Sequence, residues 1–200
     1  MRYSGSEKTD TVRRYYESYC RRGAELPLKT PEGQDTRPTT DRIKETLFNI
    51  LQGDIPGSIF VDLCSGSGGI GIEAISRGAK RAYFAENAVK AAKCIQDNLS
   101  FAKFTDRAVL LKQDVVSALG GIHEKEVDVI FMDPPYQAGL EEPVLSALSR
   151  ASYVTEDTLI IIEAELNKDF SFTQDYGFEV IREKKYKTNK HVFMKRQNAE

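Results

Sequence analysis

From residue 58 onward, short apolar runs alternate with longer stretches of helical periodicity, and this alternation constrains the fold more than any other feature. Parallel strands need a crossover connection, usually a helix, so the alternation favours an α/β domain with a mostly parallel sheet. Strands are expected at residues 59–64, 81–86, 108–113, 127–133 and 158–164. Helices are expected between them, at residues 69–77, 88–103 and 139–150.

The two ends of the chain follow other patterns. Residues 178–186 and 189–195 predict two strands joined by a short turn, which is a C-terminal antiparallel hairpin. Residues 42–51 carry apolar side chains at helical spacing and predict an amphipathic helix. We therefore expect one domain over residues 36–200, preceded by an N-terminal arm over residues 1–35.

Composition narrows the class of protein. The chain has 200 residues and a net charge of -2, and no apolar run reaches the roughly 20 residues needed to cross a bilayer. The first residues are polar and charged, so we expect no secretory signal, no membrane role and a cytoplasmic location. The three cysteines and two histidines lack the spacing of metal ligands, so no metal site is expected.

A glycine-rich loop follows the first expected strand and opens the first expected helix of the alternating region. Its glycines are Gly66, Gly68 and Gly71. Such a loop lets backbone N–H groups and a helix N-terminus face a ligand. A pyrophosphate and the carboxylate of a methionine moiety would suit it equally well, so the loop alone does not identify the ligand.

Acidic residues at three successive strand ends narrow the choice. Asp62 lies in the strand before the loop and suits a cationic ligand, such as the amino and sulfonium groups of S-adenosylmethionine. Glu86 is placed to accept both ribose hydroxyls, and Asp114 to accept the adenine amino group. Cys64, Asn87 and Val115 adjoin these acids and complete the expected donor site. Taken singly, Glu86 or Asp114 could equally be a helix cap or a surface acid.

The fourth strand ends in Asp133-Pro134-Pro135-Tyr136. Ligands of open α/β sheets bind outside the carboxyl ends of the strands, so this turn should face the same crevice as the glycine loop. Asp133 and the Pro134 carbonyl can accept the hydrogens of an exocyclic amine, Pro135 stiffens the turn, and Tyr136 can stack on a base. With an unperturbed pKa of roughly 3.9, Asp133 need not remove a proton from the amine first, because the amine becomes strongly acidic once it is methylated.

Basic residues gather near the C-terminus, where residues 182–196 carry a local charge of about +6. Aromatic residues interleaved with them suit contact with phosphate and stacking on bases or sugars. A solvated edge hairpin whose lysines prevent sheet association explains the pattern about as well. The candidate RNA contacts are Arg37, Arg42, Lys184, Lys185, Lys187 and Lys190.

Three stretches together resemble the bacterial RsmD-type 16S ribosomal RNA guanine-N2 methyltransferases: residues 28–51, the loop at 61–71, and residues 133–136. The resemblance implies a seven-stranded class I, Rossmann-like fold and S-adenosylmethionine as donor. It also implies 16S ribosomal RNA as substrate, within the small subunit or an assembly intermediate, and a monomeric enzyme. Residues 1–25 differ from the basic, glycine-rich opening usual in this family.

Other functions remain open on the sequence alone. The nearest alternative keeps the chemistry but methylates adenine N6 in DNA or RNA, or a glutamine side chain. The second alternative is a non-catalytic RNA-binding protein on the same scaffold. The intact acids and glycines argue against it. A nicotinamide oxidoreductase is a third, but it leaves Asp62 and the turn at residues 133–136 unexplained.

Overall fold

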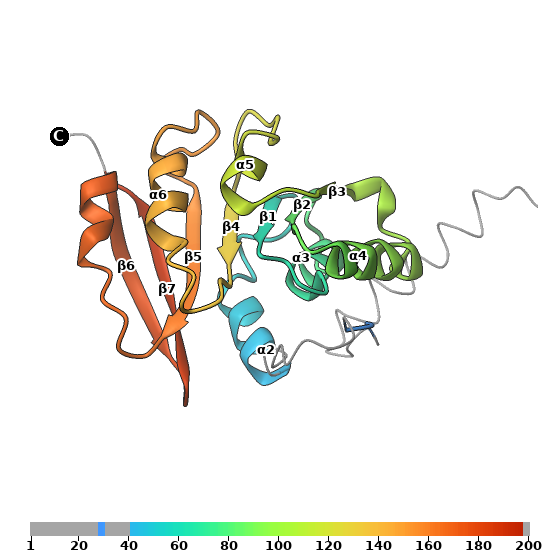
Figure 1. The fold of residues 1–200 in the computed structure, drawn as a ribbon, viewed down its shortest axis with the longest axis horizontal. Coiled ribbons are helices and arrows are strands. Elements are labelled where there is room, and N and C mark those ends of the chain that lie inside the picture. The colour runs from blue at the N-terminus through green and yellow to red at the C-terminus, as the bar shows by residue number, and fades with distance from the viewer. Residues whose placement is uncertain (1–27, 31–40, 198–200) are drawn as a thin grey trace, which may run out of the picture.

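The computed structural model describes residues 28–30 and 41–197. Seven strands form one sheet in the order β3-β2-β1-β4-β5-β7-β6 (Figure 1). The first five pair in parallel, whereas β7 is antiparallel to both β5 and β6. They are β1 (Ile59–Leu63), β2 (Arg81–Ala85), β3 (Ala108–Leu111), β4 (Val129–Met132), β5 (Leu159–Glu165), β6 (Phe178–Lys185) and β7 (Asn189–Arg196). The expected α/β sheet with a C-terminal hairpin is confirmed.

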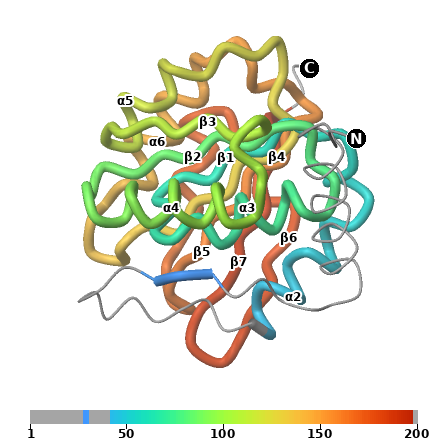
Figure 2. Tube along the Cα trace, turned by 90° about the vertical axis from the view of Figure 1, so that its right-hand side faces the viewer, coloured from blue at the N-terminus to red at the C-terminus, as the bar shows by residue number. Residues whose placement is uncertain are grey.

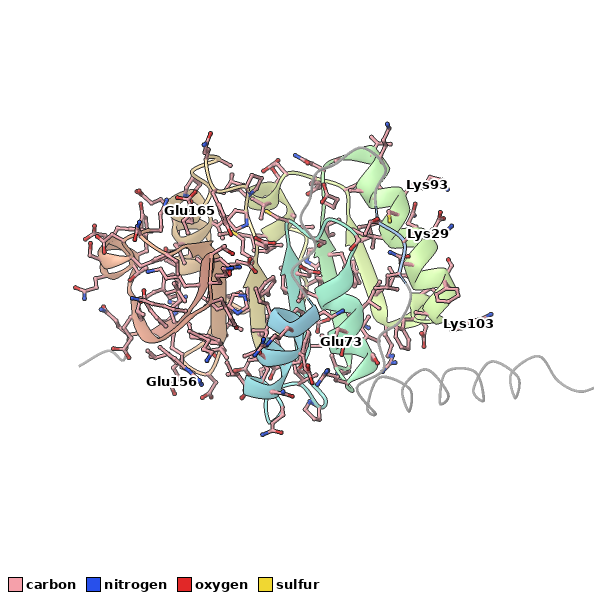
Figure 3. All side chains as sticks on the ribbon, turned by 90° about the horizontal axis from the view of Figure 1, so that it is seen from below. Lys29, Glu73, Lys93, Lys103, Glu156 and Glu165 are labelled. Carbon is pink, nitrogen blue, oxygen red and sulfur yellow. The ribbon has the colours of Figure 1, made fainter. Side chains whose placement is uncertain are left out.

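Helices cover both faces of the sheet (Figures 1 and 2). One face packs against α5 and α6, and the other against α2, α3 and α4. Figure 3 shows α2 and α3 lying over the strands on this second face. The helices are α2 (Asp41–Ile50), α3 (Gly69–Ser76), α4 (Val89–Ala102), α5 (Val115–Leu119) and α6 (Glu141–Ser149).

The central strands are mostly apolar because both of their faces are buried. Alternate residues of β4 show the division: Ile130 and Met132 join the core beneath α5 and α6, and Phe131 joins the core beneath α2, α3 and α4. Close packing leaves no room for a side chain at Gly71 in α3, where an added Cβ would lie 2.4 Å from a ring carbon of Phe84. The loop that opens α3 is thus held tightly against the sheet.

Differences from the expected elements lie at their ends, in one α-helix and in two short 3-10 helices, Thr105–Arg107 and Ser171–Tyr176, that were not expected. The strands expected at 108–113 and 127–133 span only Ala108–Leu111 and Val129–Met132, and the helix expected at 139–150 begins at Glu141. Helix α5 was not expected, since five residues are too few for a helical period to stand out. No helix of the described residues has the length and apolar character to span a bilayer.

Most of the N-terminal arm lies outside the described residues, but Leu28–Thr30 is placed against α4. The Lys29 N–H donates to Asn98 Oδ1 at 2.9 Å, and Asn98 Nδ2 donates back to the Lys29 carbonyl at 3.0 Å. Nδ2 also donates to the carbonyl of Ser67 at 2.9 Å. A single amide therefore joins this stretch to the glycine loop.

Candidate active site

The glycine loop after β1 has a backbone that favours glycine. Gly66 and Gly68 have φ values of 56° and 78°, and Cys64 has a φ of 61°, which is uncommon for a residue with a side chain. Asp62 braces the loop from below: it is 2% exposed, and its Oδ2 accepts the Gly71 N–H at 2.9 Å. Burial, and to a lesser extent the charge of Glu86, raises the pKa of Asp62 to about 7.

Glu86 follows β2 and bridges two backbone segments. Its Oε2 accepts the Gly66 N–H at 2.9 Å and its Oε1 accepts the Ala88 N–H at 2.8 Å. The structure thus places Glu86 at the loop, as expected, and shows a role in holding the loop that the sequence did not reveal. Each carboxylate oxygen has a second lone pair that can accept a ligand hydroxyl. Asn87 beside it is exposed.

Asp114 caps the helix that the sequence did not predict. Its Oδ1 accepts the Ser117 N–H at 3.0 Å, and hydrogen bonds at Ser117 lower the pKa of Asp114. The helix-cap alternative considered from the sequence therefore describes Oδ1 of Asp114, and the residue itself is exposed. Val115 is buried in the core beneath α5.

Asp133 comes directly after β4, at the carboxyl end of the parallel strands. Burial, then the charges of Glu163 and Asp62, raises its pKa to about 8. This corrects the expectation of an ordinary carboxyl, because an aspartate that is surrounded by other acids and removed from water ionises less readily. Pro134 is buried, Pro135 is exposed, and Tyr136 is 39% exposed.

The glycine loop and the acceptor turn meet because β1 and β4 are neighbours. Leu63 pairs with Met132, and the Asp133 N–H lies 3.5 Å from the Leu63 carbonyl. The pKa of the Cys64 thiol also indicates that the two halves are close. Burial raises it to about 12, with smaller contributions from the charges of Asp62, Glu86, Asp133 and Glu141. Acids from both halves of the site therefore surround one side chain.

The basic C-terminal hairpin divides into exposed and buried members. Lys184, Lys185 and Lys187, here called the hairpin lysines, lie at or near the surface around the β6–β7 turn. Lys190 is 5% exposed, and its Nζ lies 2.5 Å from Glu183 Oε1. We correct its assignment as an RNA contact, since a buried and paired ammonium does not reach a phosphate.

Two of the interleaved aromatic residues are also corrected. His191 and Phe193 in β7 are buried on the face of the sheet covered by α2, α3 and α4, so they are not available for stacking on RNA, while Tyr186 is partly exposed. Arg42 is exposed on α2, and Arg37 lies outside the described residues.

Sequence reasoning missed a group of polar residues beside the acceptor turn. Glu163 in β5 accepts hydrogen bonds from Asn189 Nδ2 and, at 3.1 Å, from His191 Nε2. A signal was present, since Glu163 ends an apolar strand run as Asp62 and Asp133 do. It was overlooked because no glycine loop or proline turn follows it.

The fold and the convergence of a glycine loop with an acidic turn define a class I, Rossmann-like methyltransferase. Among solved structures, the chain is similar to "Putative methyltransferase yhhF from Escherichia coli", with a TM-score of 0.70 and 28% identity over 87% of this chain and 92% of that one. The structure titled "crystal structure of a putative RNA methyltransferase PH1948 from Pyrococcus horikoshii" has a TM-score of 0.72 over 94% of this chain and 100% of that one, and at 17% identity it supports the fold alone.

The particular family follows from sequence comparison. The model of the family described as Conserved hypothetical protein 95 matches residues 22–195. A "Ribosomal RNA small subunit methyltransferase D" from Haemophilus influenzae is 37% identical over 149 residues, covering 74% of this chain and 76% of the relative. Its Escherichia coli K12 namesake is 34% identical, covering 72% and 71%. The chain belongs to this RsmD-type family, as its motifs predicted.

Proposed function

We propose that the protein transfers a methyl group from S-adenosylmethionine to the exocyclic N2 amine of a guanine in 16S ribosomal RNA. The observation that carries the proposal is the meeting of the acceptor turn and the glycine loop at the ends of β1 and β4, which puts Asp133 beside the expected donor site. The names of its relatives support a ribosomal RNA of the small subunit as substrate.

The residues of the glycine loop fit the donor. Asp62 is a buried carboxyl with a pKa raised to about 7, and a nearby sulfonium or ammonium group would stabilise its ionised form. Gly66, at which an added Cβ would meet nothing within 4 Å, leaves space for close approach. Glu86 can accept ribose hydroxyls, and Asp114 can accept the adenine amine. When bound, S-adenosylmethionine supplies an electrophilic methyl group.

Asp133 and Tyr136 fit the acceptor. An exocyclic aromatic amine is a poor nucleophile because its lone pair is delocalised into the ring. Asp133 and the Pro134 carbonyl accept its N–H hydrogens and favour the pyramidal, reactive nitrogen. Transfer would break the sulfonium C–S bond as the N–C bond forms, leaving S-adenosylhomocysteine. The methylated amine would then lose one N–H proton to the Asp133 carboxylate. Tyr136 stacks on the base.

The RNA is expected to approach along the surface that carries the hairpin lysines and the exposed Arg42. Phosphate contacts of this kind position an RNA without reading its sequence. We propose a monomer that acts on the small subunit or on an assembly intermediate, because the target base must be presented by folded RNA to a compact site.

A labelling experiment tests the proposal. The protein is incubated with methyl-labelled S-adenosylmethionine and, in parallel, unmethylated small subunits, free 16S RNA and duplex DNA. We expect label in N2-methylguanosine from ribosomal RNA. Label in methyladenine would replace the proposal with the adenine-N6 enzyme, and absence of label despite donor binding would favour a non-catalytic RNA-binding protein.

A further inference from the structure

Polar side chains at the acceptor site form a row across four neighbouring strands. Residues that pair in adjacent strands share a face of the sheet. Asp62 pairs with Phe131, and Glu163 pairs with His191, so Asp62, Asp133, Glu163 and His191 lie on the face covered by α2, α3 and α4. The edge of the His191 ring meets Phe131, with centroids 5.8 Å apart, which confirms that they share this face. The row extends the acceptor site beyond Asp133.

Glu163 is held firmly within this row. It is 5% exposed and accepts hydrogen bonds from Asn189 Nδ2 and His191 Nε2. On the far side of the imidazole, His191 Nδ1 lies 3.1 Å from the Tyr186 hydroxyl. Its two partners, one of which is itself held by Tyr186, fix the orientation of the carboxylate, and the carboxylate in turn orients the Asn189 amide.

Asn189 carries the feature that points to a ligand. A carboxylate only accepts hydrogen bonds, so Glu163 obliges Asn189 to present its NH₂ group and to turn its carbonyl oxygen away. That oxygen is buried and has no partner within the part of the chain that the structure describes. Buried acceptors are nearly always satisfied, and an exception calls for an explanation.

The amide also adjoins the acceptor turn. Burial and the charge of Glu163 raise the pKa of Tyr136 to about 12, and a hydrogen bond from Asn189 opposes that rise. Glu163 likewise contributes to the raised pKa of Asp133. Asn189 and Glu163 therefore stand next to the two residues expected to hold the target base.

We infer that Asn189, oriented by Glu163, reads the N1–H group of the target guanine through its carbonyl oxygen. This rests on the proposed function. Guanine presents two adjacent kinds of donor, N1–H and the N2 amine, whereas adenine presents an acceptor at N1. A site with Asp133 for the amine and a fixed carbonyl oxygen for N1–H matches guanine and leaves adenine N1 facing an acceptor. Asn189 is the specificity residue, and Glu163 is the positioning residue that prevents the amide from flipping.

The test compares guanine with 2-aminopurine at the modified position. 2-Aminopurine keeps the N2 amine but has an acceptor at N1. Small subunits are reconstituted with 16S RNA that carries either base at the nucleotide identified by the labelling experiment, and methyl transfer is followed under single-turnover conditions. The measured quantity is the guanine preference, which is the rate with guanine divided by the rate with 2-aminopurine. Both rates come from one protein sample, so partial unfolding does not change their ratio. 2-Aminopurine also lacks O6, but this difference is the same for every variant and for wild type.

The variants are Asn189→Ala, which removes the carbonyl oxygen, and Glu163→Gln, which can donate to Asn189 and lets its amide flip. We expect each to lower the guanine preference about tenfold, the size of one net hydrogen bond. The control is Glu156→Gln, which removes the same charge at an exposed position. Figure 3 shows Glu156 at one end of β5 and Glu165 at the other, so this variant should leave the guanine preference unchanged.

If a variant is too slow to measure, the same ratio is taken from equilibrium binding of the two particles with S-adenosylhomocysteine present. An unchanged ratio in both variants would overturn the inference while leaving guanine methylation intact. Wild-type protein that forms no N2-methylguanosine would instead overturn the proposed function.

Discussion

Replacing the buried carboxyl of Asp62 by an amide should stabilise the protein at alkaline pH. Folding raises the Asp62 pKa from 3.8 to about 7. The native protein therefore binds more protons than the unfolded chain between these values, so its free energy of unfolding falls as the pH rises through this window and levels off above it. A shift of about three units corresponds to about 4 kcal/mol lost by pH 8.

Asp62→Asn removes this pH-dependent loss of stability but adds a smaller loss that does not depend on pH. Asparagine Oδ1 can still accept the Gly71 N–H, whereas its NH₂ group becomes a buried donor, which costs about 1–2 kcal/mol if no acceptor meets it. We expect the variant to be about 2–3 kcal/mol more stable than wild type at pH 8 and about 0.5–1.5 kcal/mol less stable at pH 4. The two stability curves should cross near about pH 5.

Urea unfolding without donor, repeated from pH 4 to pH 8, measures this difference. Asp54→Asn, at an exposed position, is the matched control and should follow wild type throughout. A difference between Asp62→Asn and wild type that does not change with pH would refute the reasoning. S-Adenosylmethionine should bind wild type more tightly as the pH rises through about 7, because its positive charge needs the ionised carboxylate, and Asp62→Asn should lose this dependence.

Other perturbations follow from the same structure. Asp133→Asn should abolish methyl transfer and leave donor affinity by calorimetry unchanged, and turnover near the wild-type rate would remove Asp133 from the mechanism. Alanine at all three hairpin lysines should weaken RNA binding and reduce the slope of log K against log[salt] by about 2, whereas Lys80→Ala should not; equal slopes would make the hairpin structural. Gly71→Ala should destabilise the fold by about 1–3 kcal/mol in urea, because its methyl group meets the Phe84 ring, and Gly53→Ala, with open space around it, should not.

Sequence reasoning succeeded where a residue's role depends on its place along one strand. Asp62 lies one residue before the end of β1, and Glu86 and Asp133 directly follow β2 and β4. Parallel strands bring their carboxyl ends to one edge, so the approximate location of these acids followed from topology. The family resemblance added the identity of the expected donor and acceptor. The sequence did not show which of these acids would have a raised pKa. For Asp133, the rise depends on burial and on the charge of Glu163 from another strand.

Lys190 shows the opposite case. A count of basic residues treats every lysine of the hairpin alike, but β7 lies between β5 and β6 rather than at the sheet edge. Its lysine is therefore covered, with the ammonium group paired to Glu183 and lying 5.5 Å from the Phe170 ring centroid. Burial of this kind depends on the order of strands in the sheet, which charge patterning along the chain does not contain.

The acids of this site oppose the stability of the protein that carries them. Burial is the main cause of the raised pKa values of both Asp62 and Asp133. The charge of Glu86 adds to the first, and the charges of Glu163 and Asp62 add to the second, so a neutral residue at either position would destabilise the fold less. Sites of function are where such local conflicts persist. A cationic donor would relieve the conflict at Asp62, and its charge would in turn ease the ionisation of Asp133. Donor binding would then prepare the base for the acceptor amine, which is why the two halves of the site need to share one edge of the sheet.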